Sequence, residues 1–215
     1  DSSGVFTPRS EAPGTNVKTL TMGAFQDGLF KQIVGAVGTF KITFPTGKLI
    51  VFEWEFMGVW QPPTDVALIE PTYPTGDAVR FADATLTYNA VNQCVEHLGF
   101  DSGNKIIMRE CPNTEAGFES ALITDREAKI SLNPEAQLVA DEDRFGYWHD
   151  GAEHAFSCEV TAANGASFTL AAPKAQVMSL ADADRDGLLV DDAELICNKN
   201  GSNKDQDVSL TFADA

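Results

Sequence analysis

The segment from Gly38 to Phe56 constrains the fold most, because apolar residues alternate with polar ones on both sides of a short turn. A period of two is typical of a β-strand that buries one face. The turn falls at Pro45-Thr46-Gly47, so the segment predicts a β-hairpin with an apolar face that packs a core. That face comprises Phe40, Ile42, Phe44, Ile50, Phe52, Trp54 and Phe56.

The opposite face of the same hairpin carries Lys41, Glu53 and Glu55 beside threonine and valine. Charged side chains at alternate positions indicate a face that meets water. Such a face can lie on the outside of a monomer, or along a water-filled passage that several copies enclose. The choice between these two settings decides what function the hairpin serves.

The chain is acidic, with a formal charge of −17 and a pI near 4.3. This balance argues against a nucleic-acid-binding protein, since phosphate neutralisation needs clustered lysine and arginine. An acidic surface suits two other roles: it keeps a protein soluble, and it lets a DNA duplex slide past without sticking. Charge alone favours the first role.

Length and composition favour one all-β domain, although 215 residues with 43% apolar content also accommodate two small ones. No apolar run approaches the length of a membrane helix. The four cysteines are far apart in sequence and include no Cys-x-x-Cys pair, which favours free thiols in a reducing cytosol. They are Cys94, Cys111, Cys158 and Cys197.

Turn and breaker residues divide the chain into an extended N-terminal arm over 1–18 and a single β domain over 19–215. Four prolines and two glycines predict a long loop over 58–76, where exposed apolar residues are available for contacts with a partner. Asn133 as N-cap and Pro134 at the first helical position predict one helix over about 133–146. Short strands are expected over 85–88, 105–108, 119–130, 155–161, 166–170, 174–180, 188–190, 193–197 and 207–212.

Two local patterns suggest metal chemistry, and both are incomplete. Asp182, Asp184 and Asp186 precede a glycine as in the first half of a calcium loop, but the closing glutamate, Glu194, arrives one residue late. His149 and His154 lack the spacing of a zinc site. We therefore predict no metal site and no cofactor. Because no nucleophile has a partner that the sequence reveals, we also expect the protein not to be an enzyme.

The order of these pieces resembles the tail tube (major tail) protein family of long-tailed, siphovirus-like bacteriophages. The likeness covers most of the chain beyond the arm, and no single piece is diagnostic. The matching pieces are Asp27-Gly28, Gly35-Ala-Val-Gly-Thr-Phe40, Phe56-Met-Gly58, Pro-Pro-Thr-Asp65, Ile123-Thr-Asp-Arg126, Asn133-Pro134, Ala172-Pro-Lys-Ala-Gln176, Asp184-Arg-Asp-Gly187 and Asp205-Gln-Asp-Val-Ser-Leu-Thr-Phe212.

The resemblance implies a mainly β, sandwich- or barrel-like subunit with one flanking helix, which forms hexameric rings around a shared β-barrel lumen. Stacked rings would make the hollow virion tail tube that conducts the genome, assembled in the host cytoplasm. Implied partners are further copies of the chain, the tape measure, tail terminator and distal tail proteins, and viral DNA as a transient, non-specific passenger. Membrane insertion is not implied.

The resemblance also assigns residues to surfaces. Lys41, Lys48, Glu53 and Glu55 become candidates to face the lumen, although two lysines depart from a purely acidic bore. The arm and the loop become contacts between subunits and rings. The candidate loop residues are Trp60, Val66, Leu68, Ile69 and Tyr73.

Two alternatives remain open at this stage. A carbohydrate- or receptor-binding β-sandwich of a virion or cell surface would gather exposed aromatics on one platform, with Trp60, Tyr73, Tyr147 and Trp148 as candidates. A related ring protein, such as a tail terminator or baseplate component, would form rings without polymerising further.

Overall fold

The computed structural model describes residues 4–8, 18–73, 78–162, 164–202 and 205–213, and in these ranges the protein is mainly β. The described strands are β1 (Gly4–Phe6), β2 (Leu20–Gln26), β3 (Leu29–Pro45), β4 (Val51–Asp65), β5 (Ala84–Tyr88), β6 (Val91–Asn92), β7 (Val95–Asp101), β8 (Asn104–Glu110), β9 (Phe118–Arg126), β10 (Lys129–Pro134), β11 (Glu153–Thr161), β12 (Ser167–Arg185), β13 (Leu188–Cys197) and β14 (Ser209–Ala213). A short helix, α1, spans Arg144–Asp150.

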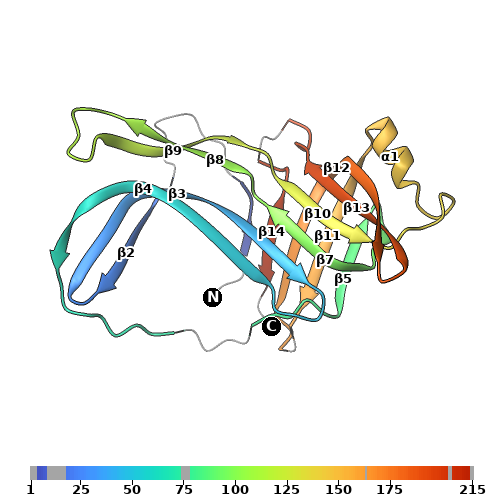
Figure 1. Ribbon diagram of the computed structural model, residues 1–215, viewed down its shortest axis with the longest axis horizontal. Coiled ribbons are helices and arrows are strands. Elements are labelled where there is room, and N and C mark those ends of the chain that lie inside the picture. Colours follow the sequence, from blue (N-terminus) through green and yellow to red (C-terminus); the bar gives the residue numbers. More distant parts are fainter. Residues whose placement is uncertain (1–3, 9–17, 74–77, 163, 203–204, 214–215) are drawn as a thin grey trace.

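The predicted hairpin is confirmed, and it is longer than the sequence pattern indicated. Strands β3 and β4 pair antiparallel from Thr43 opposite Val51 to Leu29 opposite Asp65. A bulge between Val34 and Val37, where Gly35 adopts a φ of 62°, bends this ribbon. In Figure 1 the two strands arch from the centre of the molecule to its left end.

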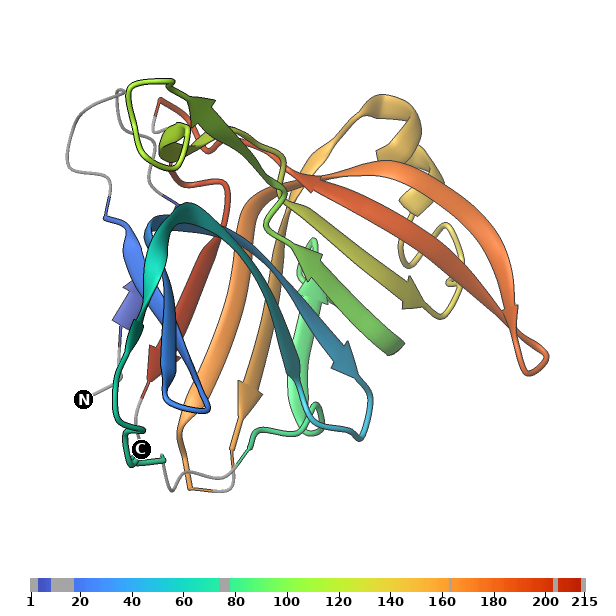
Figure 2. The same ribbon diagram turned by 60° about the vertical axis from the view of Figure 1, so that its left-hand side comes forward.

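Most strands belong to one antiparallel sheet with the order β2-β3-β7-β10-β13-β12-β11-β5-β6. The sheet folds over into two layers, which is consistent with a β-sandwich (Figures 1 and 2). The 19-residue β12 joins the layers, because it pairs with β14 over 167–171 and with β13 over 175–185. Pro173 lies between these two stretches, where pairing with β13 or β14 does not require a backbone N–H, the group that proline lacks.

The hydrophobic core lies between the two layers. β3, β7 and β10 contribute inward-facing residues such as Phe44, Leu98 and Ile130, and β11 and β12 contribute Phe156 and Leu170 from the opposite side. All five are fully buried. The alternation of the hairpin therefore does place Phe40, Ile42 and Phe44 toward a core, as predicted.

Beyond the sandwich, the chain extends as two prongs. One is the three-stranded ribbon β2-β3-β4, and the other is the separate β8–β9 hairpin, which lies above it in Figure 1. They diverge at Ser102-Gly103. There Phe40 N donates to Ser102 Oγ, and Ser102 N donates to Phe40 O. The side-chain amide of Asn104 donates to Gly38 O at 2.9 Å. Past this point, β2 replaces β7 as the neighbour of β3.

The predicted helix over about 133–146 is wrong, and the described helix begins eleven residues later at Arg144. Asn133 is buried in β10, where its side-chain oxygen accepts from the Glu96 and His97 N–H groups instead of capping a helix. Helix α1 begins after Asp143, whose carboxylate accepts from Gly146 N at 2.8 Å. It ends at Asp150, with Gly151 as C-cap in the left-handed conformation, and not at Gly146.

Other predicted boundaries also shift. The loop over 58–76 begins only after Asp65, because β4 continues through Pro62 and Pro63. Proline is tolerated there because β4 is an edge strand, which need not donate from every residue. Residues 74–76 of that loop lie outside the described residues. The strand expected over 119–130 is two strands, β9 and β10.

The N-terminal arm contains a strand in its described part. Within 4–8, Gly4–Phe6 forms β1 and pairs antiparallel with β14, and Phe6 packs edge-on against Phe212 with ring centroids 5.7 Å apart. Residues 1–3 and 9–17 of the predicted arm lie outside the described residues. The strands expected over 166–170 and 174–180 belong to one continuous strand, β12, which begins at Ser167, and those expected over 188–190 and 193–197 are parts of β13.

Candidate assembly interface

The charged face of the hairpin continues as a row of ionic side chains across four strands. Glu53 of β4 lies opposite Lys41 of β3, Lys41 lies opposite Asp101 of β7, and Asp101 lies opposite Lys129 of β10. Directly opposite residues share a face. The signs alternate along the row, so each lysine has carboxylate neighbours.

The lysines of this row are held by ion pairs. Lys41 Nζ lies 3.0 Å from Asp101 Oδ2, and the hydrogen bond and charge of Asp101 raise the pKa of Lys41 above its usual value. Lys129 Nζ lies 2.9 Å from Glu127 and 3.0 Å from Glu194, and bonding to Glu127 likewise raises its pKa. These contacts keep both lysines protonated and partnered by carboxylates.

Three of the four predicted lumen candidates lie together on this exposed face: Lys41, Glu53 and Glu55. The fourth, Lys48, is exposed in the turn at the end of the hairpin, where its backbone N–H donates to Pro45 O at 3.0 Å. Lys48 is therefore at one rim of the charged face. Whether this face lines a lumen stays a prediction.

The aromatic face of β4 departs partly from the prediction that it packs the core. Phe52, Trp54 and Phe56 stack along the strand, with successive ring centroids 6.0 and 5.9 Å apart. Phe52 contacts Phe168 of the core, but 56% of Trp54 is exposed. The ribbon extends past the sandwich in Figure 1, and much of the Trp54 ring lies beyond the second layer.

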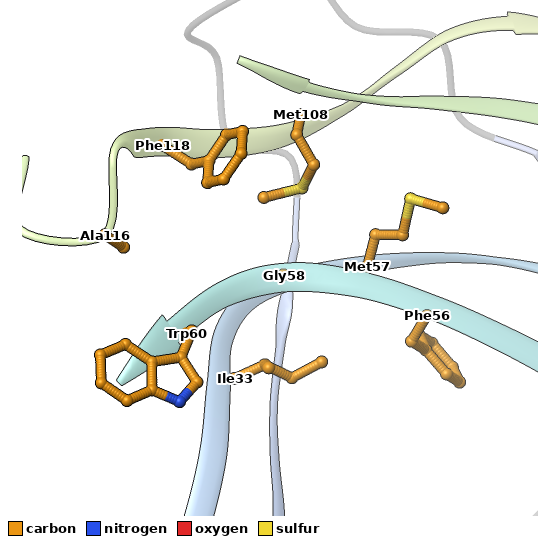
Figure 3. Close-up of a pocket in the computed structure, with 8 residues that line it drawn as sticks. All are labelled: Ile33, Phe56, Met57, Gly58, Trp60, Met108, Ala116 and Phe118. Atoms are coloured by element: carbon orange, nitrogen blue, oxygen red, sulfur yellow. The ribbon is translucent and has the colours of Figure 1, made fainter. Parts of the chain in front are cut away.

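An apolar groove of about 490 Å³ lies between the two prongs. Figure 3 shows Met108 and Phe118 of the β8–β9 hairpin pointing toward β4 at Gly58. A Cβ at Gly58 would lie 2.9 Å from Val34 O, so glycine allows the ribbon to bend tightly beneath the groove. Ile33, Phe56, Met57, Trp60 and Ala116 complete the lining.

The predicted loop contacts fall into two groups. Val66, Leu68, Ile69 and Tyr73 lie exposed on the segment after β4, in line with an available apolar surface. Trp60 does not belong to that loop, because it lies in β4 opposite Ile33. It lines the groove instead.

The four aromatic candidates for a carbohydrate platform do not gather. Trp60 lies on the outer half of β4, whereas Tyr147 and Trp148 lie on α1 at the other end of the molecule (Figures 1 and 3). Tyr147 is also partly buried and packs against His154 with its ring tilted by 57° and the ring centroids 4.3 Å apart. The arrangement gives no common surface to these side chains.

A buried polar cluster, which the sequence did not reveal, fixes the start of α1 to the sheet. Arg144 Nη1 donates to Asp191 Oδ2 at 2.6 Å, and Nη2 donates to Gln93 Oε1 at 2.8 Å and lies 2.6 Å from Glu142 Oε2. All four residues are buried. Their positions span nearly a hundred residues, so no local spacing signals the cluster. The paired charges anchor the helix.

Neither candidate metal pattern forms a site in the described residues. Asp182 and Asp184 lie in β12, and the turn closes at Asp186-Gly187. His149 pairs with Asp150 at 2.8 Å on the exposed surface of α1. No three His, Cys, Asp or Glu side chains come together as a metal-binding group within the part of the chain that the structure describes.

The four cysteines are free, as expected, and they differ in environment. Burial raises the pKa of both Cys158 and Cys197 to about 12, whereas Cys94 is exposed. Among the described residues there is no helix of the length and apolarity needed to cross a membrane. The sequence matches no protein-family model and no curated protein.

Proposed function

We propose that this protein is a structural subunit of the tail-tube type, which forms hexameric rings that stack into a hollow conduit for DNA. The observation that carries the proposal is the two-faced β3–β4 ribbon. On its charged side Lys41, Glu53 and Glu55 are exposed, and its apolar side extends beyond the core. A monomer gains nothing from exposing Trp54 and Trp60, but an assembly buries such residues between copies.

Electrostatics support a conduit that does not bind its cargo. Six copies carry 6 × −17 = −102 formal charges. The field of so acidic an assembly disfavours phosphate at its surface, although salt screens exposed charges beyond about 8 Å at physiological ionic strength. Contacts with DNA would therefore be weak and transient, which suits passage.

The lysines on the charged face are compatible with this role because carboxylates surround them. The ionic row and its partners comprise five carboxylates, Glu53, Glu55, Asp101, Glu127 and Glu194, and two lysines, Lys41 and Lys129. The local sum is −5 + 2 = −3. If this face lines the bore, the bore is acidic despite its lysines.

Assembly is tested first on the purified protein. Light scattering after size-exclusion chromatography and negative-stain microscopy should show rings of about six copies or stacked tubes, and their amount should rise with protein concentration. A protein that stays monomeric at high concentration in native buffer would refute the proposal.

The assignment of the bore is tested by charge reversal. Tubes of Glu53→Lys/Glu55→Lys should retain short duplex DNA that wild-type tubes release, since two charges per copy change sign on the proposed lining and shift its net charge by +4. The matched control is Glu159→Lys/Asp182→Lys, which makes the same charge change at exposed positions on β11 and β12. Equal DNA retention by both variants would argue against Glu53 and Glu55 as bore residues.

A further inference from the structure

The three-stranded ribbon has two open edges in the described residues. Strand β4 pairs with β3 alone, and β2 also pairs with β3 alone, so each leaves one edge of backbone donors and acceptors without a strand partner there. The β4 edge is long, and its stretch from Phe56 to Trp60 is apolar, the kind of edge that pairs readily with another strand. Pro62 and Pro63 lack N–H donors and restrict pairing to the part of β4 before them.

One row of side chains runs across the ribbon from edge to edge. Met22 lies opposite Ile33, and Ile33 lies opposite Trp60, so the three share a face. Both ends of the row are exposed, 38% for Met22 and 51% for Trp60. An apolar row that stops at two open edges would continue if the β2 edge of one copy met the β4 edge of another.

The apolar groove lies beside the β4 edge and offers a binding surface to a strand added there. The β8–β9 hairpin overhangs β4, and Met108 and Phe118 face it across the gap (Figure 3). An open strand edge next to apolar pockets is the combination that binds an added strand: the backbone supplies affinity and the pockets supply specificity. Strand β2 is seven residues long, about 23 Å at 3.3 Å per residue, and fits the part of β4 that precedes its prolines.

The strand directions fix the geometry of such a joint. Both β2 and β4 run antiparallel to β3, so they run in the same direction. Rotation about a ring axis preserves that direction, and the new pair is then parallel. A two-fold dimer would instead join β4 to β4 antiparallel and leave both β2 edges open.

We infer that adjacent copies join by parallel pairing of β4 in one copy with β2 in the next, with Trp60 packed beside Met22 of its neighbour. This inference rests on the ring assembly proposed above and identifies the strands that form it. The joint is head-to-tail, because each copy offers one β4 edge and one β2 edge. Pairing therefore propagates from copy to copy until the ring closes.

Disulfide trapping tests the joint in the full-length protein. Trp60→Cys and Met22→Cys are combined in a Cys94→Ser/Cys111→Ser background, where only the buried thiols remain. Within one copy, β2 and β4 are two strand spacings apart, about 9.6 Å, which exceeds the roughly 7 Å that a disulfide spans between Cα atoms. Any bridge between these positions therefore joins two copies.

Oxidation of the assembled double variant should convert most monomer into a ladder of covalent oligomers on a non-reducing gel, ending at the ring size. Each single variant should stay monomeric on the gel, and a mixture of the two should give dimers only. As a matched control, Trp60→Cys with Leu188→Cys, an exposed residue at the start of β13, should give no ladder.

The outcomes separate the two proposals. Rings that show no ladder would overturn the strand joint and leave the ring assembly standing. Efficient dimers from Trp60→Cys alone would establish β4–β4 pairing and overturn the head-to-tail joint. A protein that forms no rings would overturn both.

Discussion

Replacement of Arg144 by methionine should be among the most damaging single changes in the described part of the chain. The side chains of Arg144, Glu142 and Asp191 are 4%, 0% and 6% exposed, so the substitution leaves two carboxylates buried without their cation. Removing one partner of a buried ion pair costs about 3–5 kcal/mol, because the remaining charge is neither solvated nor compensated. In a domain of this size, each kcal/mol lowers Tm by about 2–4 °C, so the expected loss is about 6–20 °C.

The assay is urea and thermal unfolding followed by circular dichroism. The matched control is Arg109→Met, which removes an exposed pair with Glu119 at 3.3 Å and should cost less than about 1 kcal/mol. Adding Asp191→Asn to Arg144→Met should recover part of the loss, because it removes one of the unpaired charges. Equal stabilities for Arg144→Met and Arg109→Met would refute the assignment of a buried ionic anchor.

Two further predictions concern single positions. Gly103→Ala should lower the free energy of unfolding far more than Gly47→Ala, since a Cβ at Gly103 would clash with Glu127 O whereas one at Gly47 meets open space. Both glycines have positive φ, so the backbone strain of the two substitutions is similar. Chemical denaturation of the two variants measures the difference. Cys158 and Cys197 should react with a thiol reagent at pH 8 only after unfolding, because their pKa is raised to about 12, while exposed Cys94 reacts in the native state. Fast labelling of all thiols in native protein would contradict that burial.

The same raised thiol pKa values predict how stability varies at alkaline pH. Below about pH 9 both thiols are protonated whether the chain is folded or unfolded, so their contribution is fully present. Between pH 9 and 12 the unfolded chain loses these protons and the folded chain retains them, so the free energy of unfolding should fall. Replacing both cysteines by alanine should make the free energy of unfolding fall less between pH 8 and pH 10.5, as measured by urea titration at each pH. An unchanged pH dependence in this variant would contradict the role of the two thiols.

The sequence could predict the hairpin because its signal is local: a period of two on either side of a proline-glycine turn determines which residues face inward. It could not predict the helix, since Asn133 and Pro134 are equally suited to end a strand. In β10, the buried Asn133 satisfies two N–H groups of β7, and this tertiary contact decides the outcome. The capping of α1 by Asp143 is also local, but the sequence offered the stronger Asn-Pro signal earlier in the chain.

Tertiary context also explains what the sequence missed in the candidate interface. Alternation indicated that Trp54 and Phe52 share a face, but only the extent of the second layer decides that Phe52 is covered and Trp54 exposed. The groove likewise requires the β8–β9 hairpin to lie over β4, a contact between segments about fifty residues apart. Loop composition suggested Trp60 as an assembly residue, and the structure places it on an edge strand and not in the loop.

The bulge at Gly35 links the two surfaces on which the proposals depend. Because an extra residue enters β3 between Val34 and Val37, Val37 is buried opposite Met57 under the β8–β9 prong, while Lys41 farther along the same face stays exposed. Without that extra residue, the part of β3 beyond the bulge would shift by one residue, and Ile33 would move from the face of Trp60 to the charged face. Gly35 has a φ of 62° with open space around its Cβ position, so a β-branched residue there is strained by the backbone alone. The bulge therefore sets which side of the ribbon the apolar row occupies relative to the charged face, and a change that removes the bulge should disturb the proposed joint.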